Sequence, residues 1–270
     1  MTWWSRGLVD LALTGYLWAA VQAVLELTGR PRWSVPTRAV IVTAWVLHTV
    51  GLALRGLARS ELPVDGIHAA LSMIVWAAVL LVLWGDRHHA MRSLAAFALP
   101  PAALLGLFAA AAPEAAVFRG APIPTLWGHA VAVTVGLGAL GGNFAASLMY
   151  VLQERSLRQG RLAGLSRRLP SLDSLDQFSF QALVVGFPFL TLGIALGTIS
   201  AAWVHGPGWL WQPTPVVAAL TWVIYGVALF LRGAGRWGGR RAAYLAVLGF
   251  VGLVATVGVS LLLPTRHVVM

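Results

Sequence analysis

The chain has 270 residues, of which 59% are hydrophobic and 10% are charged, a balance that excludes an ordinary soluble domain and indicates an integral membrane protein. The absence of cysteine excludes disulfides, thiolate metal sites and cysteine nucleophiles. The net charge of +10 comes from arginines in loops that flank apolar stretches, a pattern typical of membrane insertion and not of nucleic-acid binding.

Eight stretches of the sequence are apolar and long enough, at about 20 residues each, to cross roughly 30 Å of hydrocarbon. The predicted spans are residues 7–27, 38–58, 64–84, 92–112, 127–152, 180–203, 214–231 and 241–263. The first runs into residues 27–33 (LTGRPRW) without a small-residue cleavage site, so it is a span and not a signal peptide. We therefore predict an all-α integral membrane protein, a bundle of about eight transmembrane helices that forms a single domain over residues 1–270.

The orientation of the bundle follows from the distribution of its 19 arginines. Most of them lie in the odd-numbered loops, and an excess of arginine marks the cytoplasmic side of a membrane. Both termini, and the loop between the sixth and seventh spans, are therefore predicted to lie outside. We expect a multi-pass protein of the cytoplasmic membrane, with the lipid bilayer as its surroundings.

The longest polar stretch, residues 153–178, is predicted to be a cytoplasmic connecting segment. It continues the fifth span as a helix, breaks at Pro170 and restarts near Ser171, where Ser-Leu-Asp-Ser is a helix-start signal. Small residues spaced four apart in the fifth and sixth spans predict close helix packing. They are Gly138, Gly142 and Ala146, and Gly193, Gly197 and Ala201.

The seven histidines are the groups best suited to titrate or to bind a metal near neutral pH. His48 lies near the middle of the second span, where an ionisable residue is costly and often functional. The alternative for His48 is a neutral imidazole that is hydrogen bonded to a neighbouring helix. His129 opens the fifth span and His267 follows the eighth, both at the predicted outer face. The remaining histidines fit loop or interfacial positions: His68, His88, His89 and His205.

The segment Trp203–Trp222 (WVHGPGWLWQPTPVVAALTW) has four tryptophans and no charged residue. Together with two outward imidazoles it suggests a haem site, because imidazole nitrogens take the axial positions of haem iron and indole rings offer flat apolar surfaces. In this interpretation His129 and His267 are the axial ligands, and His48 is a second or transit ligand for haem iron. The haem cradle would be formed by Trp203, Trp209, Trp211 and Trp222.

Several longer strings have an order and spacing found together in one family. They are LHTVGLALR in the second span, HAVAVTVGLGALGGNFAASLMYVLQERSLR in the fifth, LPSLDSLDQFSFQALVVGFPFLTLGIALGTISAAW through the sixth, and then WLWQP, LTWVIYGVALFLR and GRRAAYLAVLGFVGL. From about His48 to His267 the chain resembles the cytochrome c assembly family of haem-handling membrane proteins, of the CcsA, CcmC and HemX type, and HemX-like members most. The resemblance implies haem b as the ligand, bound as passenger or as cofactor, with His129 and His267 as the two outward histidines.

The resemblance extends to the Trp-rich loop, with departures. The family's hallmark there is Trp-x-Trp-Asp-Pro-Lys-Glu, which cradles haem, and Trp209, Trp211 and Pro213 match it. Where the family has Asp, Lys and Glu, this chain has Gln212, Thr214 and Pro215. His48 resembles the family's second-span histidine, and Phe230 stands where complete synthases carry a further histidine. The incomplete motif argues against holocytochrome c synthase activity and implies haem handling instead.

The leading interpretation is a haem-binding membrane protein that receives or presents haem at the outer face during cytochrome c biogenesis. Its partners would be haem, apocytochrome c or a partner membrane subunit, and no nucleic acid. One alternative is a HemX-like regulator or scaffold that controls a haem-synthesis enzyme through the segment 153–178. A second is a transporter of another small molecule, weakened by the absence of Asp or Glu deep in a span. A third is a family member with a structural role only.

Overall fold

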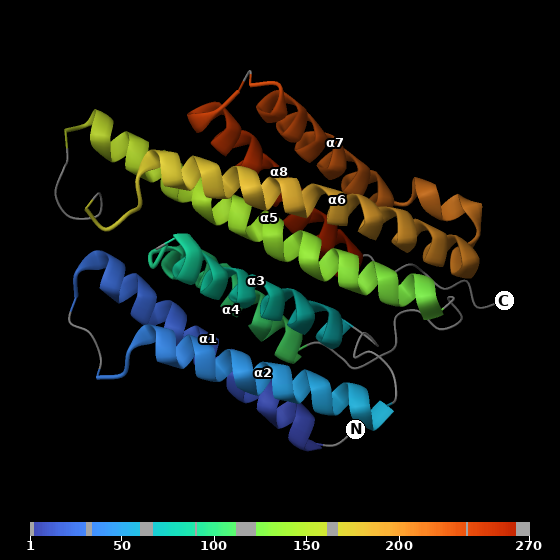
Figure 1. Ribbon diagram of the computed structural model, residues 1–270. Helices are drawn as coiled ribbons and strands as arrows, with labels where there is room; N and C mark the ends of the chain where they lie inside the picture. Colours follow the sequence, from blue (N-terminus) through green and yellow to red (C-terminus); the bar gives the residue numbers. More distant parts are fainter. Residues whose placement is uncertain are drawn as a thin grey trace.

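The computed structural model describes residues 3–30, 34–59, 67–89, 91–111, 123–160, 167–235 and 237–262. Within these ranges it contains eight α-helices, the short 3-10 helix η2 and no strand (Figure 1). The elements are α1 (Trp3–Thr28), α2 (Thr37–Arg59), α3 (Ile67–His89), α4 (Leu94–Ala111), α5 (Ile123–Arg158), α6 (Leu172–His205), η2 (Pro207–Trp211), α7 (Pro213–Gly233) and α8 (Gly239–Leu262). All eight α-helices are long and apolar enough to cross a membrane. The predicted all-α membrane bundle is confirmed.

The helices alternate in direction, so the helix ends lie at two opposite ends of the bundle (Figure 1). We call the end where α1, α3, α5 and α7 begin the Trp end, because η2 lies there. The opposite end, where the even-numbered helices begin, is the arginine-rich end. Its described arginines are Arg30, Arg38, Arg87, Arg92, Arg155, Arg158, Arg167, Arg168, Arg232, Arg240 and Arg241. The structure thus gathers the arginines at one end, and the side of the membrane that this end faces stays a prediction.

The eight helices form two halves in which each helix has the same kind of neighbours. In the first half α1 packs against α2 and α4, and α3 packs against α2 and α4. In the second half α5 packs against α6 and α8, and α7 packs against α6 and α8. The halves meet chiefly through α3 and α5. Figure 1 shows this as a stack that runs from the blue pair α1 and α2 to the orange α7 and the red α8.

The helices α5 and α6 are longer than their predicted spans and pack together most closely. With 36 and 34 residues they are about 50 Å long, which exceeds the hydrocarbon thickness of roughly 30 Å. Their contact depends on small residues, since a Cβ at Gly136 would lie 3.0 Å from the backbone nitrogen of Leu190. The predicted restart of the helix is confirmed, because Ser171 Oγ caps α6 by accepting from the Ser174 N–H at 3.2 Å.

The described parts of the segment 153–178 are packed on the bundle. Leu169 belongs to the apolar core formed mainly by the first half. Arg168 donates a hydrogen bond from Nη1 to the carbonyl oxygen of Glu26, at the end of α1. The turn that follows α1 has Gly29 at a φ of +84°, and a Cβ there would lie 2.8 Å from Arg168 Nη2. The segment therefore caps α1 and does not extend from the bundle as a free loop in the part that the structure describes.

Candidate functional site

His129, on α5 near the Trp end, is held in one orientation by the neighbouring helix α6. Its Nδ1 atom lies 2.7 Å from the carbonyl oxygen of Gly193. Because a carbonyl can only accept, Nδ1 carries the proton and Nε2 keeps the lone pair. A hydrogen bond of this kind fixes the tautomer and ring plane of a histidine that binds a metal through its other nitrogen. In the neutral imidazole of His129, Nε2 is thus the nitrogen left available for a further bond.

Gly197 forms the surface on which the His129 imidazole rests. A Cβ atom at this position would lie 2.6 Å from Nδ1 and 2.7 Å from Cε1 of the ring. The small-residue face predicted for the sixth span therefore makes room for an aromatic side chain of α5 as well as for a close helix. One turn nearer to the Trp end, Ser200 donates a hydrogen bond to Thr125 Oγ1 across the same interface, at 3.0 Å.

Three tryptophans lie on the connection between α6 and α7, and we call them the Trp platform. Trp203 is in the last turn of α6, while Trp209 and Trp211 are in η2. Trp203 is 73% exposed and Trp211 is 87% exposed. The chain can turn here because Gly206 ends α6 with a φ of +74°, in the region that favours glycine. The platform offers indole surfaces in a segment without charged side chains.

Trp222, the fourth predicted member of the cradle, lies elsewhere. It is nine residues beyond Pro213, the first residue of α7, which places it about 14 Å along the helix from η2. Its Nε1 donates a hydrogen bond to Thr191 Oγ1 at 2.9 Å, and its ring stacks on Phe187 with the centroids 5.6 Å apart. Trp222 therefore attaches α7 to α6, and the structure does not bring it to the Trp platform.

His48 lies in the first half of the bundle and is fully buried. Its Nδ1 is hydrogen bonded to the hydroxyl of Tyr16 on α1 at 3.2 Å, and its Nε2 to the hydroxyl of Ser72 on α3 at 2.7 Å. Both ring nitrogens are thus engaged, as in the alternative of a hydrogen-bonded neutral imidazole. The assignment of His48 to haem iron stays a prediction, and in this arrangement it requires one of the two hydrogen bonds to break. Phe230 lies in the other half, exposed on α7.

His267, the second predicted outward ligand, lies outside the described residues. The described part of the chain has no group of three or more His, Cys, Asp or Glu side chains that could hold a metal ion. A ligand set built from protein side chains alone is therefore not found there. Of the predicted site residues, His129 near the start of α5 and the Trp platform between α6 and α7 lie at the same end of the bundle, the Trp end.

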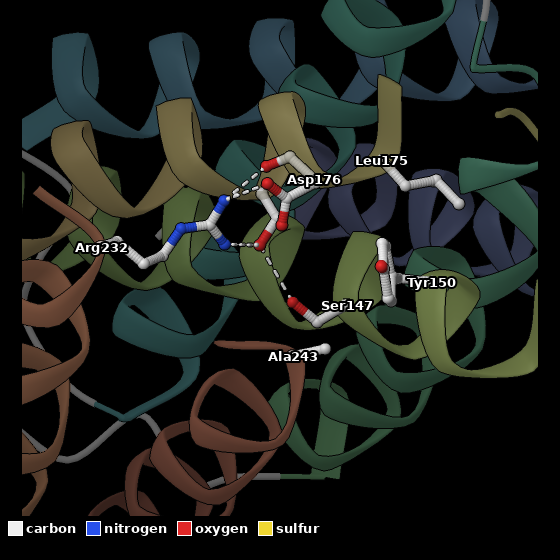
Figure 2. A pocket seen from close by; sticks show the side chains of 7 residues that line it. Ser147, Tyr150, Leu175, Asp176, Arg232 and Ala243 are labelled. Atoms are coloured by element: carbon white, nitrogen blue, oxygen red, sulfur yellow. Dashed lines mark hydrogen bonds and ion pairs between the residues drawn. The ribbon is translucent and has the colours of Figure 1, made fainter. Parts of the chain in front are cut away.

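A polar cluster that the sequence did not predict lies near the arginine-rich end, and Figure 2 shows it from close by. Arg232 Nη2 on α7 lies 2.9 Å from Asp176 Oδ2 on α6, and Ser179 Oγ lies 3.0 Å from Ser147 Oγ on α5. The packing leaves no room for a water-sized molecule among these side chains. These residues lie in the sequence strings that carry the family resemblance, which was the signal that could have found them. Their spacing in the sequence did not indicate that their side chains meet.

Comparison with known proteins agrees with the family resemblance of the sequence segments. A family model described as Cytochrome C assembly protein matches residues 33–267. The cytochrome c biogenesis protein CcsA of Prochlorococcus marinus strain MIT 9313 is 29% identical over 268 residues, which cover 87% of this chain and 84% of that protein. CcsA of Synechococcus sp. strain RCC307 is 28% identical over 282 residues, with 93% and 91% covered. Since the family model matches most of its length, the chain belongs to the cytochrome c assembly protein family.

Proposed function

We propose that the chain binds haem between His129 and the Trp platform, at the end of the bundle that faces outward, and presents it there. Membership of the family already gives the chain a role in cytochrome c maturation. The observation that carries the haem proposal is the hydrogen bond from His129 Nδ1 to the Gly193 carbonyl. It leaves Nε2 with its lone pair and fixes the plane of the ring before any ligand arrives.

The described residues fit haem b in their chemistry. Haem supplies an iron that takes axial nitrogen ligands and a large apolar ring. His129 provides one nitrogen, and the exposed indoles of Trp203 and Trp211 provide flat apolar surface at the same end of the bundle. His267 is proposed as the second axial ligand, from its place after the eighth span and from the family resemblance.

The outward direction is part of the proposal and depends on charge. The arginine-rich end has at least eleven arginines in its described part, whereas Arg6, Arg55 and Arg59 are the described arginines of the Trp end. Arginine excess marks the cytoplasmic side of a membrane, so the Trp end would face outward. Haem presented there would be accessible to apocytochrome c, which we propose as a partner together with a second membrane subunit.

An absorption spectrum of the purified full-length protein with added haem tests the proposal. We expect a Soret band for the wild-type protein, and loss or a clear shift of this band in the double variant H129A/H267A. The control variant is H88A/H89A, which changes two adjacent histidines of α3 at the arginine-rich end and is expected to keep the wild-type spectrum. An unchanged spectrum in H129A/H267A would rule out the proposed site.

A second prediction concerns the Trp platform. Replacing Trp211 with alanine removes an exposed indole, and we expect haem to bind about threefold to tenfold more weakly, the scale of an aromatic contact of 0.5–1.5 kcal/mol. Trp4 is 63% exposed on α1 at the same end of the bundle, so W4A is the matched control. Haem titrations followed at the Soret band measure both variants. Equal affinities for W211A and W4A would place haem elsewhere.

A further inference from the structure

A single carboxylate on α6 holds both sides of the turn between α7 and α8. Asp176 Oδ2 pairs with Arg232 Nη2 at 2.9 Å, in the last turn of α7. Its Oδ1 accepts a hydrogen bond from the Gly239 N–H at 3.1 Å, at the first residue of α8. The backbone carbonyl oxygen of Asp176 accepts a second hydrogen bond from Arg232 Nη2 at 2.8 Å. Figure 2 shows the guanidinium of Arg232 directed at these oxygens.

The guanidinium depends on this carboxylate because it is buried. The Arg232 side chain is 7% exposed, and its other contacts include the ring of Phe180 at 5.1 Å and the hydroxyl of Ser179 at 3.5 Å. Neither neighbour carries a negative charge. A buried charge that loses its partner is strongly unfavourable, so we expect removal of the Asp176 charge to favour a shift of the last turn of α7 that brings Arg232 closer to water.

Beside its apolar packing on α6 and α8, the helix α7 is attached to α6 by polar contacts at two levels. Only 17% of its span is buried, the lowest share among the eight candidate spans. The hydrogen bond from Trp222 to Thr191 attaches it near its middle. The pair of Asp176 with Arg232 attaches it at the arginine-rich end. The apolar packing holds α7 beside α6 and α8, and the two polar contacts fix its register at specific levels; the ion pair is the more buried of the two on the α7 side.

We propose that Asp176 is a positioning residue that sets the register of α7 against α6, and through it the position of the Trp platform relative to His129. From Arg232 to Pro213 the helix is about 29 Å long, and a continuous helix can transmit an axial shift along its length. Pro213 directly follows η2, so a shift of α7 along its axis displaces Trp209 and Trp211. The last step, an effect on haem, rests on the proposed function. The effect on helix register does not.

The absence of cysteine makes the register measurable by spin labels. Cysteines introduced at Ile199 on α6 and Val216 on α7, both exposed and near the Trp end, can be labelled in the full-length protein without other changes. We expect one narrow distance distribution in this labelled parent. In the variants D176N and R232Q the distribution should broaden or shift. Asp173 is an exposed acid in the first turn of the same helix, and D173N is expected to leave the distance unchanged.

Haem binding provides the second readout. We expect D176N and R232Q to bind haem about tenfold more weakly, the scale on which packed helices couple distant sites, and D173N to bind as the parent does. R232K keeps the positive charge and is the control for misfolding of R232Q. Its spin-label distance and haem affinity should lie between those of R232Q and the parent. A lower melting temperature with parental distance and affinity would show a merely structural role and overturn the proposal.

The two proposals fail in different ways. If the haem site is wrong, the parent shows no Soret band that depends on His129, while the spin-label distances still report the register of α7. If the positioning role is wrong, H129A still loses haem, but D176N and R232Q give the same distances as D173N. The variant H129A itself should keep the parental distance, because His129 lies on α5 and is bonded to α6 only.

Discussion

Replacing Gly197 with alanine is expected to weaken haem binding about 10- to 100-fold, the range seen when the groups that orient a metal-binding histidine are changed. A Cβ at this position would lie 2.6 Å from Nδ1 of His129. The imidazole is the end of a side chain, so it can rotate away, whereas the backbone of α6 is fixed by its own hydrogen bonds. Rotation of the imidazole breaks the hydrogen bond from Nδ1 to Gly193 and turns Nε2 away from the direction in which it would bind the haem iron.

The fold should survive this change. Alanine is favoured over glycine inside a helix by about 1 kcal/mol, so α6 itself is not weakened. The control is G258A in α8, where an added Cβ meets no atom within 4 Å. Haem titration with a check of melting temperature measures both variants. If G197A binds haem as tightly as G258A does, then the orientation of His129 has no part in binding.

The second large effect is expected at His48. Replacing it with alanine leaves the buried hydroxyls of Tyr16 and Ser72 without their hydrogen-bond partner and opens a cavity among α1, α2 and α3. We expect the free energy of unfolding to fall by about 2–4 kcal/mol. The haem spectrum should stay as in the wild-type protein, because His48 lies in the first half of the bundle and His129 in the second.

A double-mutant cycle separates the hydrogen bond from the cavity. Y16F removes only the hydroxyl that faces His48 Nδ1, and we expect a loss of about 1–2 kcal/mol. In the double variant the two losses should be less than additive, because the residues share one contact. Denaturation in detergent micelles gives the four stabilities. A Soret shift in folded H48A would instead support the predicted role of His48 as a ligand of haem iron.

The spans were predictable because hydropathy and length decide which segments enter a membrane. The orientation of His129 was not, since its partner Gly193 is 64 residues away and only the packing of α5 on α6 brings them together. The placement of Trp222 near the platform was inferred from its closeness in sequence to Trp211. The helix that starts at Pro213 carries it down to Thr191 instead.

The polar cluster at the arginine-rich end shows the same limit from another side. Arg232 looked like one of many arginines that flank a span, which is what the positive-inside pattern supplies. Arg232 differs from exposed neighbours such as Arg241 because Asp176 on α6 lies beside its guanidinium. Charge at the end of a span is visible in sequence, but burial of that charge depends on which helix lies beside it. His48 was open to two interpretations for the same reason.

The order in which Asp176 and Arg232 leave the ribosome has a consequence for membrane insertion. The carboxylate precedes the guanidinium by 56 residues, which corresponds to about 3–11 s of synthesis at 5–20 residues per second. Once α6 has entered the bilayer, Asp176 is in place before the last two helices arrive. The final hairpin, α7 with α8, can then dock as one unit onto a carboxylate that receives both Arg232 and the start of α8. In a chain without Asp176, the hairpin of α7 and α8 would insert while the Arg232 guanidinium had no carboxylate to pair with and still favoured contact with water.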